Sequence, residues 1–385
     1  MVSFLDSITS GFSKILAPTP EGSAIGIDIG SSSAKIVQLR PSRGSAVLET
    51  YGEIALGPFG GEPIGKAVKL GPEKLAEALQ MLMKEANVTA HIGGISIPFA
   101  SSLISVLDFP MVDKNALTTM IPIEARKYIP VPISEVTLDW FVIPKDDTDV
   151  SAFDRVTKGP STTKGPQKQQ ILLVAIENHA LNDFKQVTQT VGLTTEFYEI
   201  EIFSTIRSSL GRSTAPVLVA DVGASTTKLY VVERGVVRLT HLVTVGGQQM
   251  SETLARSLGW EFEKAERIKR ECGLDGSTAF SLDENEKIKA ALLSTLDRIF
   301  SEVNRVLLNY GQRYNKNVSH VVLTGGGASL PGLAQQAKAS LSADVEIADP
   351  FSRAEAPAFL GSVLRGIGPG FAVAMGLVLH KLKDA

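Results

Sequence analysis

Several features are scarce in this 385-residue sequence, and each scarcity removes a class of protein. A single cysteine, Cys272, excludes a disulfide framework and is typical of a reducing compartment. A formal net charge of −3 gives no positive field for non-specific nucleic-acid binding. No apolar run approaches the roughly 18 residues of a membrane span, and the N-terminus lacks the basic and apolar regions of a signal peptide. These absences predict a cytoplasmic protein that does not bind nucleic acid.

The length and composition are those of a globular protein with more than one core. Hydrophobic residues make up 44% of the chain and charged residues 21%, close to the globular average. A chain of 385 residues exceeds one ordinary hydrophobic core, so we expect two or more domains.

One short pattern occurs twice. At 25–39, apolar residues alternate into an acid, a turn of Gly and Ser follows, and a second alternating run leaves through a lysine, which predicts two strands joined by a tight turn. The pattern returns at 217–232 with every matching residue displaced by the same interval (221 − 28 = 193). The matching pairs are Asp28 and Asp221, Gly30 and Gly223, Ser32 and Ser225, and Lys35 and Lys228. The repeat predicts a duplicated fold whose halves each direct a turn at a shared ligand.

The chemistry of these turns favours phosphate. Either copy alone is also compatible with an ordinary turn, because Gly, Ser and Asp are common in turns. Backbone N–H groups and hydroxyls in a concave turn bind phosphate. The acid beside each turn would repel phosphate unless a divalent cation lay between them, and carboxylates with phosphate oxygens and water suit Mg²⁺.

A third glycine cluster, Gly325–Gly327, lies between an expected strand at 321–323 and a helix. Small residues there let a ligand approach the backbone, and a helix N-terminus favours anions. The cluster is neither G-x-G-x-x-G nor a P-loop, which disfavours a dinucleotide-binding fold and a P-loop fold.

The remaining periodicity predicts the order of the elements. After the first hairpin we expect a strand at 46–54, a helix at 72–86 and a strand at 92–97, which is a β-β-β-α-β order. An inserted α+β segment follows at 101–176, with strands at 103–107, 136–142 and 171–176, a helix at 114–128 and a polar loop at 145–170. Residues 197–210 are expected to cross between the halves. Further helices are expected at 180–191, from about 250, at 260–270 and 290–314, and a buried one at 371–382, and a strand at 237–243.

Two phosphate hairpins followed by a late triple-glycine turn resemble the actin/Hsp70/sugar-kinase superfamily. Within it, the chain from about 22 to 385 resembles the PilM family of type IV pilus assembly, and more distantly the division protein FtsA. The stretches that carry this resemblance, besides the first hairpin, are 108–110, 124–130, 265–269, 324–333 and 368–377.

The resemblance implies an α/β fold with two ribonuclease-H-like, actin-type domains around a nucleotide cleft and an inserted α+β subdomain of the FtsA/PilM type. The implied division is a first half-domain at 22–100, 177–212 and 370–385, the insertion at 101–176, a second half-domain at 213–249 and 318–369, and a small helical lobe at 250–317, preceded by a separate segment at 1–21.

The resemblance also implies the residues of an ATP site. Gly30, Ser31, Ser32, Ser33 and Lys35 would surround one side of the phosphates, and Gly223, Ser225 and Thr226 the other. Asp28 and Asp221 would hold Mg²⁺, mainly through water. Gly325, Gly326, Gly327 and Ser329 would flank the adenosine, with Gly246 and Gly247 near the sugar and phosphates and Glu266 and Lys269 near the ribose and adenine.

Some of these residues have a second interpretation. Lys35 is also compatible with an exposed strand lysine, and Glu266 with Lys269, at an i, i+3 spacing, with a surface ion pair. Asp221 and Glu199 are the candidates for the hydrolytic chemistry, which needs a residue to orient water. Glu199 and its neighbour Glu201 are equally compatible with strand-end acids, so we expect ATP binding with slow or absent hydrolysis.

The implied function is a cytoplasmic scaffold, peripheral to the inner membrane, that joins the pilus motor ATPases to a membrane complex. Its partner would be the N-terminal peptide of the inner-membrane protein PilN, bordered by Arg126, Tyr128 and Ile129, with other inner-membrane pilus assembly proteins and self-association as further contacts. The alternatives are an FtsA-like membrane-associated filament protein and a small-molecule kinase of the same superfamily. The amphipathic residues 2–16 keep the filament alternative open, although they would equally pack on the protein's own body or on a partner.

Overall fold

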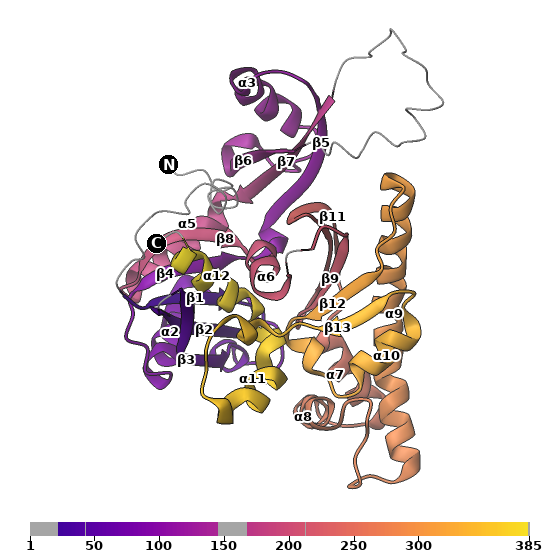
Figure 1. Ribbon diagram of the computed structural model, residues 1–385. Helices are drawn as coiled ribbons and strands as arrows, with labels where there is room; N and C mark the ends of the chain where they lie inside the picture. The colour runs from indigo at the N-terminus through magenta and orange to yellow at the C-terminus, as the bar shows by residue number, and fades with distance from the viewer. Residues whose placement is uncertain (1–21, 43, 145–167, 212, 384–385) are drawn as a thin grey trace.

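The computed structural model describes residues 22–42, 44–144, 168–211 and 213–383. The predictions for the segment 1–21, and for residues 145–167 of the polar loop expected at 145–170, lie outside these residues. Residues 168–170 of that expected loop are strand, because they pair with a neighbouring strand of the inserted segment. Within the described residues, the chain forms two twin α/β halves and a smaller inserted subdomain (Figure 1).

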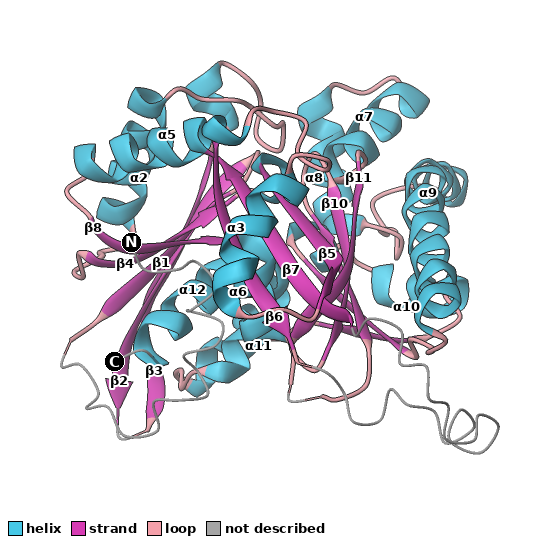
Figure 2. Cartoon of the chain, turned by 90° about the horizontal axis from the view of Figure 1, so that it is seen from above, coloured by secondary structure: helices cyan, strands magenta, loops and turns pink. Residues whose placement is uncertain are grey.

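The first half is built on a five-stranded sheet. Its strands are β1 (Ala24–Ile29), β2 (Ser33–Ser42), β3 (Ser45–Ala55), β4 (Ile92–Ile97) and β8 (Thr194–Ile200), in the order β3-β2-β1-β4-β8. β1 is antiparallel to β2 and parallel to β4, as the β-β-β-α-β prediction requires. Helices α2 (Pro72–Glu85) and α5 (Asn178–Thr190) pack side by side beside this sheet (Figure 2).

The second half repeats this sheet. Its strands are β9 (Val217–Val222), β10 (Thr227–Glu233), β11 (Val236–Val243), β12 (His320–Thr324) and β13 (Asp344–Ile347), in the equivalent order β11-β10-β9-β12-β13. β9 is antiparallel to β10 and parallel to β12. The duplication read from two short hairpins therefore extends to whole sheets.

Helices of the second half complete its core. They are α7 (Gly247–Leu258), α8 (Phe262–Cys272), α9 (Leu282–Tyr314) and α10 (Leu333–Ser340). The next helix, α11 (Gly361–Ile367), instead packs its buried Leu364 against residues of the first sheet, such as Val37 and Leu39. α9 begins at Leu282, earlier than the predicted Ala290, because Ser281 and Glu284 form a capping box that satisfies the first backbone N–H groups.

The inserted subdomain has its own sheet and core. Strands β5 (Ser102–Pro110), β7 (Lys168–Glu177) and β6 (Val136–Ile143) lie in that order, and α3 (Lys114–Ala125) packs on them. It stands beyond the first sheet at the top of Figure 1 and touches the second half where Arg238 Nη1 donates to Gln170 Oε1 over 3.2 Å.

Two central helices lie between the sheets, α6 (Glu201–Ser209) and α12 (Ala372–Lys383) (Figure 2). They pack at unusually short range. A Cβ at Gly26 would lie 2.1 Å from the Ala374 carbonyl oxygen, and one at Gly376 would lie 1.9 Å from the Ser204 carbonyl oxygen. Only glycine fits at either contact.

The expectation that no apolar stretch could span a membrane needs correction. By length and composition the helical run Ala358–Leu382 qualifies, but 67% of its most apolar window is buried inside the protein. α12 is a core helix, as predicted for 371–382.

Two other predictions differ from the structure. The expected crossing segment at 197–210 is divided between β8 and α6, so the first sheet has a fifth strand that the pattern did not reveal. β13 was also missed, because three of its four residues are exposed and it carries two acids. Short turns of 3-10 helix lie at Gly57–Gly60, Phe99–Ser101, Ile133–Glu135, Gly326–Ser329, Pro350–Arg353, Ala358–Leu360 and Gly368–Phe371.

Candidate functional site

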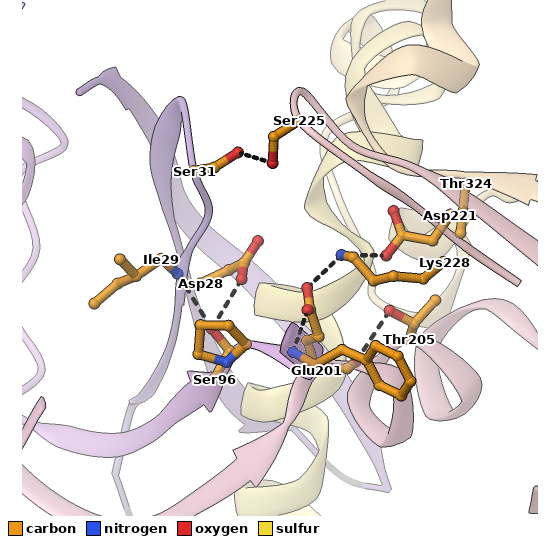
Figure 3. A network of polar contacts seen from close by, with 12 residues as sticks. Asp28, Ile29, Ser31, Ser96, Glu201, Thr205, Asp221, Ser225, Lys228 and Thr324 are labelled. Atoms are coloured by element: carbon orange, nitrogen blue, oxygen red, sulfur yellow. Dashed lines mark hydrogen bonds and ion pairs between the residues drawn. The ribbon is translucent and has the colours of Figure 1, made fainter. Parts of the chain in front are cut away.

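The two hairpin turns face each other across the space between the halves. Each is closed by a backbone bond, from Gly30 N to Ser33 O over 3.0 Å and from Gly223 N to Thr226 O over 2.9 Å. Ser225 Oγ donates to Ser31 Oγ over 3.1 Å, which joins turns that are far apart in the sequence (Figure 3). The repeated pattern therefore converges on one place.

A cavity of about 620 Å³ lies at this convergence, within the size range of small-molecule sites. It brings together most of the predicted residues. Those that line it are Asp28, Gly30, Ser31, Ser32, Ser33, Lys35, Asp221, Gly223, Ser225, Thr226, Gly247, Glu266, Lys269, Gly325, Gly326, Gly327 and Ser329. Gly246 and Glu199 do not line it.

Gly246 supports the second hairpin instead of the cavity. A Cβ at this position would lie 2.6 Å from the carbonyl oxygens of Gly223 and Ala224. The N–H groups of Gly247 and Gln248 donate to those same carbonyls over 2.9 and 2.8 Å. The start of α7 is thereby fixed against the turn.

The two acids lie at the ends of equivalent strands. Asp28 Oδ1 accepts from Ser96 Oγ over 2.8 Å, and burial raises the pKa of Asp28 despite the cations nearby. Asp221 is 4% exposed, and its Oδ2 lies 2.9 Å from Lys228 Nζ. Both acids therefore border the cavity from opposite halves.

Glu199 is a correction to the predicted site. Burial opposes its ionisation, but Arg207 pairs with it over 2.7 Å, and together with the nearby His380 holds the pKa of Glu199 well below its usual range. Ser204 also donates to this carboxylate. Its side chain is directed at α6 and α12 because it lies on the strand face that these helices cover.

The acid that borders the cavity is Glu201, two residues later, in the first turn of α6. Its Oε1 accepts from Phe99 N over 2.7 Å, and its Oε2 lies 2.5 Å from Lys228 Nζ. Burial raises the pKa of Glu201, with Lys228 acting against it.

Lys228 is the main site residue that we did not predict. Burial would lower its pKa, but the adjacent Asp221 and Glu201 raise it well above its usual value. The signal was present, since Lys228 occupies the place of Lys35 in the repeat.

Lys35 is not an exposed, unpaired lysine on the surface of its strand. Its Nζ donates to Ser33 Oγ over 2.7 Å and pairs with Glu53 over 3.1 Å, at the edge of the same cavity. The side chain is 12% exposed, so of its two interpretations the geometry favours a position beside the hairpin turn.

The third glycine cluster packs against the end of β9, the first strand of the second hairpin. Gly325 has a φ of +81°, and its Cβ would lie 2.3 Å from Asp221 Oδ1, so only glycine is accommodated. By contrast, a Cβ at Gly326 would meet nothing within 4 Å, which leaves that backbone open to the cavity. Ser329 Oγ donates to the Gly366 carbonyl oxygen over 2.8 Å, so this hydroxyl is already bonded within the protein.

Glu266 and Lys269 form a buried pair instead of a surface one. Lys269 Nζ lies 2.6 Å from Glu266 Oε2 and donates to Gly247 O over 3.0 Å. Burial lowers the pKa of Lys269, whereas Lys269 keeps the pKa of Glu266 low against the effect of burial. The pair joins α8 to the start of α7 in the cavity wall.

A segment of the first half, 61–70, reaches the second half at this side of the cavity. Ala67 N donates to Gln248 Oε1 over 2.9 Å, and Val68 N donates to Ser31 O over 2.9 Å. Gly65, with a φ of +94°, lies against Glu266, since a Cβ there would be 2.5 Å from its Cδ. We call residues 61–70 the bridging segment.

The donors and acceptors of this cavity fit a nucleotide with its cation. Two concave turns offer N–H groups and hydroxyls, and the ammonium groups of Lys35 and Lys269 add further donors. Glycines such as Gly326 leave the backbone open where a base or sugar would approach. Among the described residues no three Asp, Glu, His or Cys side chains converge to hold a metal ion by themselves. Asp28 and Asp221 suit a cation that keeps its waters and is shared with phosphate oxygens.

Two twin sheets of this order, joined by central helices and enclosing such a cavity, define an actin-like α/β protein, so the predicted fold class is confirmed. The family model for type IV pilus assembly protein PilM matches residues 26–382. The chain therefore belongs to the PilM family.

Solved structures support the fold. A PilM-PilN type IV pilus biogenesis complex is similar with a TM-score of 0.74 at 23% identity, covering 94% of this chain and 99% of that one. MreB5 of Spiroplasma citri bound to ADP is similar with a TM-score of 0.51 at 11% identity, covering 93% and 95%. At these identities the likeness establishes the fold.

Curated relatives include cell division proteins FtsA. The FtsA of Agrobacterium fabrum is 28% identical over 180 residues, a match to 42% of this chain and 39% of that protein. The FtsA of Enterococcus faecalis is 22% identical over an alignment of 370 residues, and the match covers 86% of this chain and 79% of that protein. The match to the first of these spans about two-fifths of the relative's length.

Proposed function

We propose that the chain binds ATP with Mg²⁺ between its halves and serves as an actin-like scaffold of type IV pilus assembly. The observation that carries the proposal is the pair of equivalent hairpin turns, one from each half, that meet through Ser31 and Ser225 at the wall of one cavity. A ligand with several phosphates would contact both turns at once.

The residues that line the cavity are assigned roles according to the part of the nucleotide that each would contact. The turns at 30–33 and 223–226 would hold the phosphates, and Asp28 and Asp221 would hold Mg²⁺ through water. Gly325–Gly327 and the pair of Glu266 and Lys269 would lie beside the nucleoside. The cation would neutralise phosphate charge that the two acids otherwise repel.

Slow or absent hydrolysis is part of this proposal. Orienting water for attack on a phosphate needs a free acceptor. Of the two candidate acids, Glu199 is paired with Arg207 outside the cavity and Asp221 is paired with Lys228. Both oxygens of the neighbouring Glu201 already accept bonds, from Phe99 N and Lys228. The nucleotide would then mainly hold the two halves together, which couples binding to conformation.

The proposed partner is the N-terminal peptide of PilN, bound as an extended segment between the first half and the inserted subdomain. The PilM-PilN complex among the similar structures supports it. Among the described strands β6 pairs only with β7, and an open strand edge can accept an extended peptide. Of the three residues expected to border the peptide, Arg126 and Tyr128 are exposed. Ile129 is buried in the subdomain core, so it is not part of the proposed peptide site.

This proposal places the protein on the cytoplasmic side of the inner membrane, held there by its partners. Other inner-membrane pilus proteins and the motor ATPases would be further contacts, and copies of the chain would self-associate. The PilM family membership supports this setting.

The test is a titration of the purified protein with ATP, with and without Mg²⁺, followed by a PilN N-terminal peptide, with phosphate release assayed in parallel. We expect tight Mg-ATP binding, little phosphate release and peptide binding that Tyr128→Ala weakens at least tenfold. Phe359→Ala, at another exposed aromatic residue that does not line the cavity, is the matched surface control. Rapid phosphate release without peptide binding would contradict the scaffold.

The similarity to cell division proteins FtsA favours one second candidate, the FtsA-like membrane-associated filament protein that the sequence resemblance implied. It predicts that ATP drives the chain into particles that sediment at high speed. Pelleting in ATP but not in ADP would favour the filament protein over the scaffold.

A further inference from the structure

One buried ammonium joins acids from both halves of the molecule. Lys228 Nζ lies 2.5 Å from Glu201 Oε2 and 2.9 Å from Asp221 Oδ2 (Figure 3). Glu201 opens α6, directly after the first sheet, whereas Asp221 belongs to β9 of the second. The Lys228 side chain is only 13% exposed, so this contact lies within the cleft and not on the surface.

The equivalent lysine of the first hairpin behaves differently. Lys35 stands opposite Asp28 in the strand register, as Lys228 stands opposite Asp221. Yet Lys35 pairs with Glu53 over 3.1 Å, and Asp28 accepts from Ser96. Strand register alone therefore does not place a lysine on the acid, and the contact of Lys228 is particular to the second half.

The acids around Lys228 have contacts besides the one to the lysine, a hydrogen bond for Glu201 and close packing for Asp221. Glu201 Oε1 accepts from Phe99 N over 2.7 Å, and the buried Asp221 has its Oδ1 so close to Gly325 that a Cβ on Gly325 would lie 2.3 Å from it. Mg²⁺ and Mn²⁺ are commonly bound by one or two carboxylates with water completing the shell. A small cation at the position of Lys228 Nζ would find two carboxylate oxygens that need to move by less than about 1 Å to reach bonding distance.

We propose that Lys228 is a resident cation of the cleft that occupies the place of a divalent metal between Glu201 and Asp221. The metal that enters with a nucleotide and shares Asp221 would compete with Lys228 for that carboxylate, and this consequence rests on the proposed function. The protein without nucleotide binds divalent cations poorly at these acids because the ammonium already occupies the position between them and offsets part of their charge. Lys228 is thus a positioning residue that ties metal entry to nucleotide entry.

The experiment measures Mn²⁺ binding to the whole chain without nucleotide, by electron paramagnetic resonance of free Mn²⁺. Lys228→Met and Lys228→Gln remove the charge, and Lys228→Arg keeps it. Lys381→Met is the matched control, because Lys381 is also partly buried and ion-paired, with Glu196, but lies on α12. We expect the two neutral variants to bind Mn²⁺ at least tenfold more tightly than the wild type, with Lys228→Arg and Lys381→Met unchanged.

A double variant distinguishes Mn²⁺ binding at these two carboxylates from a general effect of losing Lys228. Asp221→Asn combined with Lys228→Met removes one of the two carboxylates, so it should lose the gained Mn²⁺ binding. If a neutral variant folds poorly, Mn²⁺ should restore its thermal transition, since a bound cation would replace the lost ammonium.

These outcomes test the role proposed for Lys228 independently of the proposed ATP binding. Folded neutral variants that bind Mn²⁺ no better than the wild type, or variants that stay unfolded in Mn²⁺, overturn the role of Lys228. Both results are obtained without nucleotide. Failure of the wild type to bind ATP would contradict the proposed function and would leave the Mn²⁺ comparison intact.

Discussion

Two glutamates separated by one residue have different surroundings because a strand ends between them. Glu199 belongs to β8 and is directed toward Arg207 and His380 beneath the central helices. Glu201 begins α6, where the change from strand to helix turns its side chain into the cleft. The sequence places both acids near the crossing, but only the backbone geometry separates a structural ion pair from a cleft residue.

The first prediction concerns the buried ion pair of Glu199. Removing one partner leaves a buried charge without its counterion, so Glu199→Gln should lower the free energy of unfolding by about 3 kcal/mol at pH 7. The pKa of Glu199 in the folded protein lies below its ordinary value of 4.5. The stabilisation is therefore fully present above that pH and is lost as the pH falls.

Urea unfolding of the wild type and of Glu199→Gln from pH 7 to pH 3 tests this. The difference between them should shrink by about 1.4 kcal/mol per pH unit below 4.5. A difference that does not change with pH would show that the carboxylate charge contributes nothing.

At the scale of elements, helix contacts at glycines fix the molecule's centre. α12 lies against β1 at Gly26 and against α6 at Gly376, and neither position leaves room for a methyl group. Arg207 Nη1 also donates to Gly376 O over 3.0 Å. The pair of central helices is therefore a tightly fitted unit between the sheets.

The second prediction follows from this fit. Gly376→Ala would place a Cβ 1.9 Å from the Ser204 carbonyl oxygen, so the helices must move apart. We expect a loss of about 2 to 3 kcal/mol in the free energy of unfolding. Gly366→Ala on α11 is the control, since its Cβ would meet nothing within 4 Å and alanine favours a helix. Equal effects of the two changes in urea unfolding would refute the close-contact argument.

The third prediction concerns the bridging segment 61–70. Its bond from Ala67 N to Gln248 Oε1 connects the halves beside the cavity. Gln248→Ala should speed dissociation of a fluorescent ATP analogue, by about fivefold if one hydrogen bond worth about 1 kcal/mol is lost. Gln80→Ala, which removes an exposed bond to Thr190 O on the first half, should leave the stopped-flow rate unchanged. Equal rates for wild type and Gln248→Ala would show that the segment does not retain the ligand.

At the scale of the whole molecule, ligand binding and stability are linked because the cavity exists only between assembled halves. A ligand at about 100 times its dissociation constant adds about 2.7 kcal/mol to the stability of the state that binds it. The proposed function therefore predicts that Mg-ATP raises the thermal transition of the wild type.

The fourth prediction uses this linkage. Asp221→Ala should fold, yet bind Mg-ATP at least tenfold more weakly and lose most of the thermal shift, because one metal ligand is gone. Asp344→Ala, at an exposed position on β13, should keep the full shift. An unchanged Mg-ATP affinity of Asp221→Ala in calorimetry would remove the metal role of Asp221.

The sequence by itself determined the duplicated plan and most of the cavity wall. Alternating strands and glycine turns are local signals, and the repeat at a constant interval indicated that the two hairpins hold equivalent places in a duplicated fold. Residues in those turns, such as Gly30 and Gly223, were predicted because the backbone conformation of a turn restricts what can occupy it. The same holds for Gly325, whose positive φ is a local requirement.

Only the tertiary structure decided which charged side chains meet. Lys35 and Lys228 are equivalent in sequence and register, yet one pairs with Glu53 and the other joins Glu201 to Asp221. The partners come from distant segments, and the direction of a long side chain depends on which acid is buried within its reach. A local sequence pattern contains no information about which distant segments lie close in space. The position of the Lys228 ammonium between the halves could therefore be seen only in the tertiary structure.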